Sequence, residues 1–465
     1  MGFNIGPICI TSICVADDTY ILSDCPRKLQ AAIDIVGHYG KRYRVVFGAD
    51  KTKAVITGSK IDMQYFKDVK MWTLFDDQIN VTDENDHLGL IVSGCDEERK
   101  NIDKNIQSCR KSLFALLGPA FAYQCKLSPT VQAHLWQVYC QPILRSGLAA
   151  LPIRPAHMEP LKMFQHSVLR GFLKLSKSSP VPAMFFLLGE LPIEGRLHLD
   201  VMSLFWTIWD NSETTVKQVI KYILMMSTEK SLTWSVHLRL IFRKYNLPDP
   251  LSLLESEVWP KLKWKELTKT RVQAYHEQLL REKARQNSKM EYLNVELTGL
   301  TGRSHPILSG VNTAREVEKL RPAVKMLAGD YLTFARLSKD SGGEVSPHCR
   351  LCEGDPGLQP LSRDSCDTIE HVLCQCLATS EVRGRIMSDL VNAVQECYPD
   401  NRILSGCDDS TMTQFILDCS SANLPNDIRF NISDPNITRI FAFTRDLGFA
   451  IHSAQIIKLK ELESR

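Results

Sequence analysis

Two adjacent carboxylates, Asp17 and Asp18, interrupt an apolar, β-branched stretch near the amino terminus. The flanking residues 8–15 and 19–22 have the composition of two strands, so the sequence predicts a hairpin with the acids near its tip. Two like charges at a tip repel each other unless a cation neutralises them. The pair is therefore either an ordinary acidic turn or a divalent-metal site for phosphoryl or nucleotidyl transfer.

A second group of potential ligands lies near the carboxyl terminus. Cys349 and Cys352 form a Cys-x2-Cys pair, His371 follows after 18 intervening residues, and Cys376 follows after four more. A Cys-x2-Cys turn lets two thiolates reach one ion, and this order of ligands suits tetrahedral zinc. Loop-forming residues surround these positions, as expected where a metal replaces a hydrophobic core. The sequence predicts a zinc site, and the alternative is a set of free thiols.

The identity of the fourth ligand is open at this point. If a regular helix begins at His371, Cys374 at i+3 shares its face, whereas Cys376 at i+5 points away. Cys376 can then be a ligand only if the helix starts irregularly. His348 and Cys366 also lie close enough in sequence to compete.

Residues 259–290 form the most basic part of the chain, with nine cations against three glutamates and with aromatic residues between them. Neutralising phosphates while stacking bases is how proteins hold single-stranded or hybrid nucleic acid. The candidate nucleic-acid-binding residues are Lys261, Lys263, Trp264, Lys265, Lys269 and Arg271. The alternative is a solvated, lysine-rich surface helix.

The composition sets broad limits. A chain of 465 residues with 44% hydrophobic and 23% charged residues has room for two to four globular domains, and a net charge of +3 singles out no partner. Fifteen cysteines without a recognisable signal peptide argue for a reducing compartment. The longest apolar runs are too short to span a bilayer. We expect an intracellular protein, nuclear or cytoplasmic, that is neither secreted nor bound to a membrane.

Helical periodicity dominates after residue 96. Ile102, Ile106, Cys109, Leu113 and Leu116 recur at intervals of three and four residues and predict a helix that ends at Gly118-Pro119. Further helices are predicted near residues 129–141, 157–175, 195–211, 214–227, 382–397 and 437–462. The sequence before residue 96 has mixed, strand-like patterns around one helical stretch, residues 26–39.

Four stretches together resemble the reverse transcriptases of non-LTR (LINE-like) retrotransposons. Residues 15–23, which contain Val-Ala-Asp-Asp, resemble the family's Tyr/Phe-x-Asp-Asp motif. Residues 45–56 are similar to the next motif, a strand entering and leaving a Lys-Thr dipeptide, and residues 87–92 to its short Leu-Gly strand. Residues 349–376 are similar to the family's C-terminal Cys-Cys-His-Cys module. The resemblance covers roughly residues 1–380 and is sharpest in 5–95 and 345–380.

The resemblance implies an α+β fold in which a truncated polymerase palm, an antiparallel hairpin with further strands, precedes a mostly helical thumb and connector and a small zinc module. The implied segments are a partial palm (1–95), a thumb-like region (96–230), a basic connector (231–335), the zinc module (336–380) and a helical tail (381–465). In the family, another catalytic Asp and a nucleotide-binding helix precede the Asp-Asp motif. We therefore expect the fingers and half of the palm to be missing here.

The resemblance also assigns roles to individual residues. Asp17 would bind magnesium or manganese, Asp18 would support the site electrostatically, and Lys51 would lie near the triphosphate. Val15 departs from the family's aromatic residue beside the acids. Family spacing favours Cys376 as the fourth zinc ligand. The implied partners are an RNA template and a DNA primer or target. We expect a polymerase remnant that is inactive alone, and the alternative is a non-catalytic nucleic-acid-binding protein.

Overall fold

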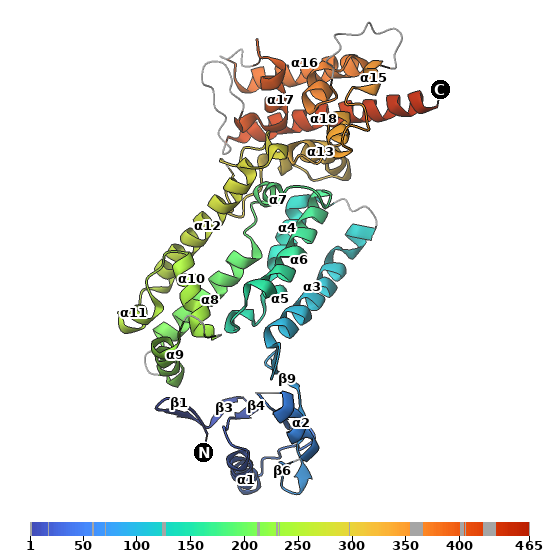
Figure 1. Ribbon diagram of the computed structural model, residues 1–465. Coiled ribbons are helices and arrows are strands. Elements are labelled where there is room, and N and C mark those ends of the chain that lie inside the picture. The colour runs from blue at the N-terminus through green and yellow to red at the C-terminus, as the bar shows by residue number, and fades with distance from the viewer. Residues whose placement is uncertain are drawn as a thin grey trace. The chain divides into compact units, whose positions relative to one another are not determined.

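The computed structural model describes residues 2–16, 18–57, 60–69, 71–122, 127–211, 214–228, 231, 233–296, 298–353, 366–399, 404, 406–421 and 434–464. In these residues the chain is mostly helical with a few small two-stranded sheets, an α+β organisation (Figure 1). Contacts divide the chain into two units. The first comprises residues 1–110, 141–161 and 194–272, and the second comprises residues 111–140, 162–193 and 273–465. Neither unit is continuous in sequence.

All the strands of the described residues lie in the first unit. The antiparallel pairs are β1 (Phe3–Ile5) with β2 (Ile8–Ile10), β3 (Ser12–Val15) with β4 (Asp18–Ile21), β6 (Thr73–Leu74) with β7 (Asp77–Gln78), and β9 (Glu84–His87) with β10 (Leu90–Ser93). A parallel pair joins β5 (Lys53–Val55) to β8 (Asn80–Thr82). In sequence, the helix α1 (Pro26–Tyr43) lies between β4 and β5, and the helix α2 (Lys60–Val69) lies between β5 and β6.

The predicted hairpin around the acidic pair is confirmed. Val15 pairs with Asp18, and Ala16, which follows Val15, has a positive φ of 54°. Asp18 is the first residue of β4 and is exposed to solvent. Asp17 lies outside the described residues. The predicted helix over residues 26–39 is also confirmed, because α1 covers it and continues to Tyr43.

Two strand predictions from the resemblance need correction. Residues 45–52 form no strand, and β5 begins only at Lys53. Leu88 and Gly89 form the turn between β9 and β10 rather than part of a strand. Both have positive φ values, 47° and 84°, as a two-residue hairpin turn of the primed type requires. The Leu-Gly dipeptide therefore reverses the chain.

The predicted helices are present within a few residues of their expected ends. They are α3 (Glu97–Ala122), α4 (Pro129–Leu135) continuing through a π-helical turn (Trp136–Cys140) into α5 (Gln141–Arg145), α6 (Pro155–Leu173), α8 (Ile193–Asp210) and α9 (Thr215–Met226). The predicted end of α3 is wrong, because the helix continues through Gly118 and Pro119 to Ala122. Pro119 lacks the backbone N–H that would bond to the carbonyl four residues earlier, and the helix ends three residues after it.

Further helices complete the two units. They are α7 (Val181–Leu188), α10 (Trp234–Lys244), α11 (Pro250–Glu255), α12 (Lys261–Arg285), α13 (Ala314–Leu327), α14 (Phe334–Asp340), α15 (Arg350–Glu353), α16 (Ser380–Cys397), α17 (Asp409–Asp418) and α18 (Pro435–Glu463). Of these, α16 and α18 confirm the helices predicted near residues 382–397 and 437–462. In the second unit, α18 packs on α13 and α16 (Figure 1). α7 is apolar on all sides, and its residues 182–188 are buried in the core.

A buried polar pair joins three segments of the second unit. His305 Nε2 lies 3.2 Å from a carboxylate oxygen of Asp418, and both side chains are fully buried. Ile307 N donates to His305 Nδ1, so the imidazole donates from Nε2. Asp418 also accepts from the backbone N–H groups of Asn294 and Ser420. Burial alone would raise the pKa of Asp418, but these donors and His305 together hold it below its ordinary value.

Replacing Asp418 should strongly destabilise the second unit. We expect Asp418→Ala to lower the free energy of unfolding by about 3–5 kcal/mol, because it leaves several buried donors without a partner. Urea denaturation followed by circular dichroism measures the change. Asp389→Ala, at an exposed position on α16, is the matched control and should stay within about 0.5 kcal/mol of the unmodified chain. An equal effect of the two substitutions would contradict the structural role of the pair.

The same pair sets a pH dependence. A carboxylate whose pKa is lowered on folding stabilises the folded chain above its unfolded pKa, and this contribution is lost as the pH falls through the folded pKa. The stability difference between the unmodified chain and Asp418→Ala should therefore shrink below about pH 4. A difference that stays constant down to about pH 2 would contradict an ionised Asp418.

Candidate metal centre

Two short helical segments carry the cysteines and histidine that the sequence singled out. Cys349 immediately precedes α15, and Cys352 lies within it. The backbone N–H groups of Cys352 and Glu353 both donate to Cys349 O, which closes a tight turn between the two thiols. His371 begins a π-helical turn (His371–Gln375), and Cys376 follows that turn directly. The two segments lie in the second unit.

The four side chains converge on one point. Cys376 Sγ lies 4.0 Å from Cys349 Sγ and 3.8 Å from Cys352 Sγ, and Cys352 Sγ lies 3.5 Å from His371 Nε2. All four ligand atoms lie within 4.8 Å of one another. Around a tetrahedral ion with bonds of about 2.3 Å to sulfur and about 2.0 Å to nitrogen, neighbouring ligand atoms lie about 3.5–3.8 Å apart. The cluster can therefore hold one metal ion.

The irregular helix start selects Cys376 over Cys374. Cys376 N donates to His371 O at 2.7 Å, a bond that spans five residues and widens the turn beyond an α-helical one. In a regular α-helix Cys376 would lie about 140° around the axis from His371. The wider turn brings Cys376 back toward His371 and directs Cys374 elsewhere. Cys374 Sγ lies 3.3 Å from Thr413 Oγ1 on α17. The π-helical turn confirms the expected irregular start.

The other competing residues do not join the cluster. His348 and Cys366 pair with each other through a backbone bridge, and neither belongs to the group of converging ligands. Their pairing has a structural use, because it joins the segment before Cys349 to the segment before His371. The two ligand-bearing segments are thus held together by backbone as well as by the cluster itself.

The electrostatics of the cluster favour a bound cation. The hydrogen bond from the Cys349 thiol lowers the pKa of Cys376 to about 3, with a further contribution from His371. The same hydrogen bond raises the pKa of Cys349, and burial raises that of Cys352. Without an ion the group therefore holds one thiolate readily, while a second is opposed by burial and like charge. A divalent cation removes that opposition.

Several supporting residues gave no signal in the sequence. Thr368 Oγ1 accepts from His371 N and fixes the start of the π turn, and Arg383 donates to Cys376 O at 2.8 Å. Asp367 accepts from Phe334 N at 2.7 Å, and its own N–H donates to Pro347 O. Burial raises the pKa of Asp367 above its ordinary value. Spacing between ligands could not have identified Asp367, because it acts through the backbone of other segments.

The predicted polymerase residues are placed only in part. Asp18 lies at the start of β4, and Lys51 lies in an exposed turn before β5. Asp17, the expected magnesium ligand, lies outside the described residues, so magnesium binding stays a prediction. Within the described ranges, the Cys/His cluster is the one group of three or more such ligands that lie close together.

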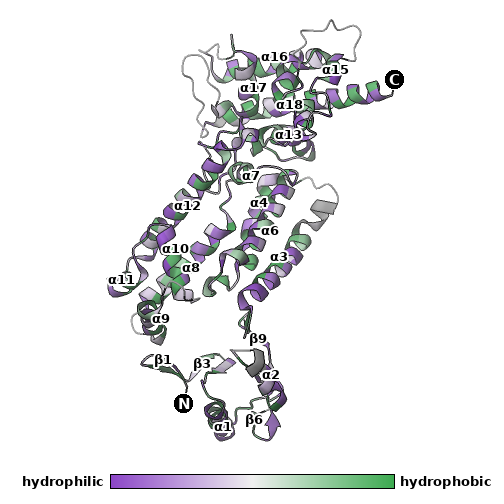
Figure 2. Cartoon of the chain, viewed as in Figure 1, coloured by the Kyte–Doolittle hydropathy of each residue, from purple (hydrophilic) through white to green (hydrophobic). Residues whose placement is uncertain are grey.

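The predicted nucleic-acid-binding residues lie on α12, where Figure 2 shows hydrophilic residues recurring along the helix. The cations Lys261, Lys263, Lys265, Lys269 and Arg271 are all exposed. Lys261 and Lys263 lie 5.0 Å from the ring centres of Trp206 and Trp259.

The assignment of Trp264 to base stacking is wrong. Its side chain is 1% exposed and packs among Phe205, Trp209 and Phe242, and its Nε1 donates to Met202 O at 3.0 Å. Because α12 is amphipathic, its aromatic residue at this position faces the core of the first unit while its cations face solvent. The surface that remains for nucleic acid is cationic.

The chain was compared with protein-family models and with curated proteins. No protein-family model matches it, and neither does any curated protein. Among the described residues, no helix combines the length and the apolar character needed to cross a membrane.

Metal retention should distinguish the two neighbouring cysteines. We expect Cys376→Ser to lose most of the metal that the unmodified chain retains, because a serine hydroxyl replaces a thiolate ligand. The matched control, Cys374→Ser, should retain about one ion per chain. Inductively coupled plasma mass spectrometry after gel filtration measures the metal content. Loss of metal in Cys374→Ser with retention in Cys376→Ser would overturn the ligand assignment.

Proposed function

We propose that the chain derives from a non-LTR retrotransposon reverse transcriptase and that it binds nucleic acid through a zinc module and the exposed cations of α12. The observation that carries the proposal is the convergence of Cys349, Cys352, His371 and Cys376. The module of the resembled family has the same order of ligands. The hairpin that presents Val15 and Asp18 on either side of its turn adds independent support.

The donor set favours zinc over other ions. Three thiolates and one imidazole are soft or borderline ligands, and a closed set of four is typical of structural zinc. The surroundings agree with a structural role, since the local core consists of Cys349, Leu351 and Cys376 with a few partly buried neighbours. A bound zinc would supply the stability that so small a core lacks.

The basic face of α12 is the best candidate for phosphate contacts. Its five exposed cations extend over about three turns of one helix. Phosphate neutralisation of this kind gives affinity without sequence preference, and its strength falls as salt rises. This part of the proposal does not depend on the acidic pair.

We also propose that the chain does not synthesise DNA by itself. Two-metal nucleotidyl transfer needs carboxylates that hold both ions. Here Asp17 would hold magnesium, Asp18 would support the site electrostatically, and Lys51 would balance triphosphate charge. A palm also requires an acid from another strand, and the resembled motifs of this chain do not include one. A non-catalytic nucleic-acid-binding protein is the alternative, favoured by the fact that α12 and the metal cluster are both formed without the acidic pair.

Neutralising α12 should weaken binding to nucleic acid. The combined variant Lys261→Gln, Lys263→Gln, Lys265→Gln and Lys269→Gln should reduce the slope of log affinity against log salt by about 0.7 for each phosphate of a single strand that is no longer neutralised. Fluorescence anisotropy with a labelled single-stranded oligonucleotide measures the slope.

The matched control for α12 neutralises four exposed lysines elsewhere: Lys177→Gln, Lys339→Gln, Lys458→Gln and Lys460→Gln. This control changes the net charge equally but should leave the slope close to that of the unmodified chain. If the two combined variants lose affinity to the same extent, α12 is not the binding face and net charge alone explains the binding.

A primer-extension assay tests the catalytic part. With an RNA template, a DNA primer and Mg²⁺ or Mn²⁺, we expect no extension above a protein-free blank, while an active reverse transcriptase extends the same substrate. Robust synthesis that is abolished by Asp17→Asn would show that the chain is a complete polymerase and would contradict the proposed inactivity.

A further inference from the structure

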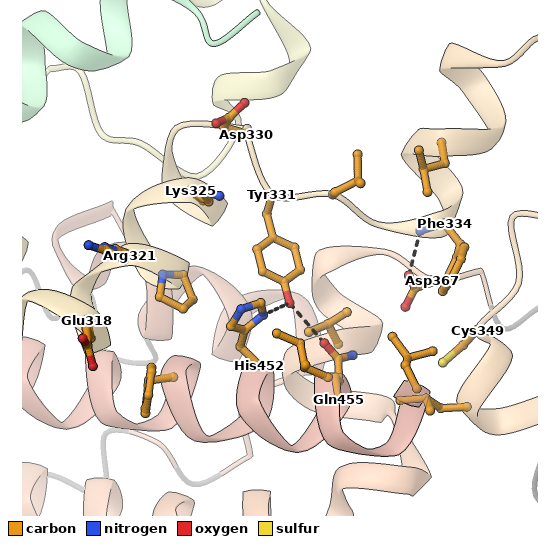
Figure 3. A pocket seen from close by; sticks show the side chains of 18 residues that line it. Glu318, Arg321, Lys325, Asp330, Tyr331, Phe334, Cys349, Asp367, His452 and Gln455 are labelled. Carbon is orange, nitrogen blue, oxygen red and sulfur yellow. Dashed lines mark hydrogen bonds between the residues drawn. The ribbon is translucent and has the colours of Figure 1, made fainter. Parts of the chain in front are cut away.

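A cavity of about 550 Å³ lies beside the metal cluster in the second unit (Figure 3). Its walls come from α13, α14, α18 and the segment that carries Cys349. One side is apolar and includes Pro322, Leu351 and Phe449. Leu332 and Ile456, which are 62% and 39% exposed, also line it and leave apolar surface open to solvent. A cavity of this size suits a small organic ligand or one unit of a polymer.

The ring of Tyr331 projects into this cavity and is held firmly. Figure 3 shows its hydroxyl directed at His452 and Gln455, and the distances are 2.8 Å to His452 Nδ1 and 3.1 Å to Gln455 Oε1. Its backbone N–H donates to Lys325 O after a turn in which Gly329 has a positive φ of 63°. Tyr331 is 8% exposed, and with both ends fixed its ring forms a rigid part of the cavity wall.

Two cations line the same cavity. Arg321 and Lys325 lie one turn apart on α13 and so share a face of that helix. Arg321 Nε is buried and has no hydrogen-bond partner among the described residues. Of the acids that line the cavity, Asp330 and Asp367 already accept hydrogen bonds from other segments, and Glu318 is exposed to solvent. The positively charged side chains of Arg321 and Lys325 would attract an anionic group.

We infer that this cavity takes one nucleotide of a single-stranded nucleic acid. The base would lie against Tyr331, and its phosphate would contact Arg321 and Lys325. The amide N–H groups of Gln455 remain available for a base edge, since its oxygen already accepts from Tyr331. A purely apolar occupant would remove these charged groups from water, at a cost in free energy. The inference rests on the proposed nucleic-acid function and names a site distinct from α12.

Photocrosslinking of the full chain tests the site directly. The probe is a single-stranded RNA of about twelve nucleotides carrying 5-iodouracil, with crosslinked peptides mapped by mass spectrometry. We expect crosslinks in residues 318–337 or 449–459. Tyr331→Leu should weaken binding of the same RNA by roughly tenfold, because it removes the stacking surface. Tyr331→Phe keeps the ring and should bind within about twofold of the unmodified chain.

Charge variants test the phosphate contact. Arg321→Gln with Lys325→Gln should weaken binding and lower the salt slope by about 1.4, whereas Lys339→Gln with Lys458→Gln should change neither. Glu318→Gln should tighten binding because it removes a repelling carboxylate. Metal content and urea midpoints measured on each variant show whether a loss of binding reflects unfolding.

The outcomes separate this inference from the proposed function. Equal binding by Tyr331→Leu and Tyr331→Phe, with crosslinks confined to α12, would overturn the cavity site and leave nucleic-acid binding intact. The cavity site is likewise overturned if folded Arg321→Gln, Lys325→Gln protein binds RNA like the unmodified chain. Absence of any RNA binding by the unmodified chain would instead overturn the proposed function and the cavity site with it.

Discussion

The convergence of three thiols and one imidazole is the constraint on which the carboxyl-terminal part of the chain depends. Four ligand atoms lie within 4.8 Å of one another in a cluster whose hydrophobic support is small. Ionising a second cysteine of this cluster costs free energy unless a bound cation neutralises the charge. Leu459 and Leu462 of α18 pack against the cluster, so the long terminal helix is tied to the same point. A metal at this position would therefore stabilise the contact of two loops with α18.

The same segment also forms one wall of the neighbouring cavity. Cys349 contributes a thiol to the cluster and lines the cavity, and Leu351 packs beside both. Asp367 links this wall to the start of α14 by accepting from Phe334 N. Loss of the metal should therefore alter the cavity wall formed by Cys349 and Leu351, even where Tyr331 and Arg321 are unchanged. Metal binding and ligand binding in this unit are expected to be coupled through shared packing.

Sequence reasoning predicted the parts that depend on local pattern and residue type. The amphipathic helices, the hairpin before Asp18 and the Cys-x2-Cys turn all follow from short-range rules. It could not decide between Cys374 and Cys376, because that choice depends on one backbone bond from Cys376 N to His371 O. A π-helical turn has no reliable signature in a single sequence.

Other differences arise from tertiary packing. Trp264 has the spacing of a surface stacking residue, yet its indole is buried by residues about 20 to 60 positions away in sequence. The Leu88-Gly89 dipeptide was expected within a strand from the resemblance but has the dihedral angles of a turn. The cavity around Tyr331 unites segments more than 100 residues apart, so no local pattern could indicate it. The division into two units that alternate along the chain could not be predicted from the sequence for the same reason.

The identity and the ligands of the metal are the most direct point at which to test the proposed module. X-ray absorption at the zinc edge, measured on the full chain as purified, reports both. We predict one zinc with three sulfur neighbours at about 2.3 Å and one nitrogen neighbour at about 2.0 Å. A chain that folds without bound metal, or a zinc bound through oxygen and nitrogen alone, would contradict a closed Cys-Cys-His-Cys zinc centre.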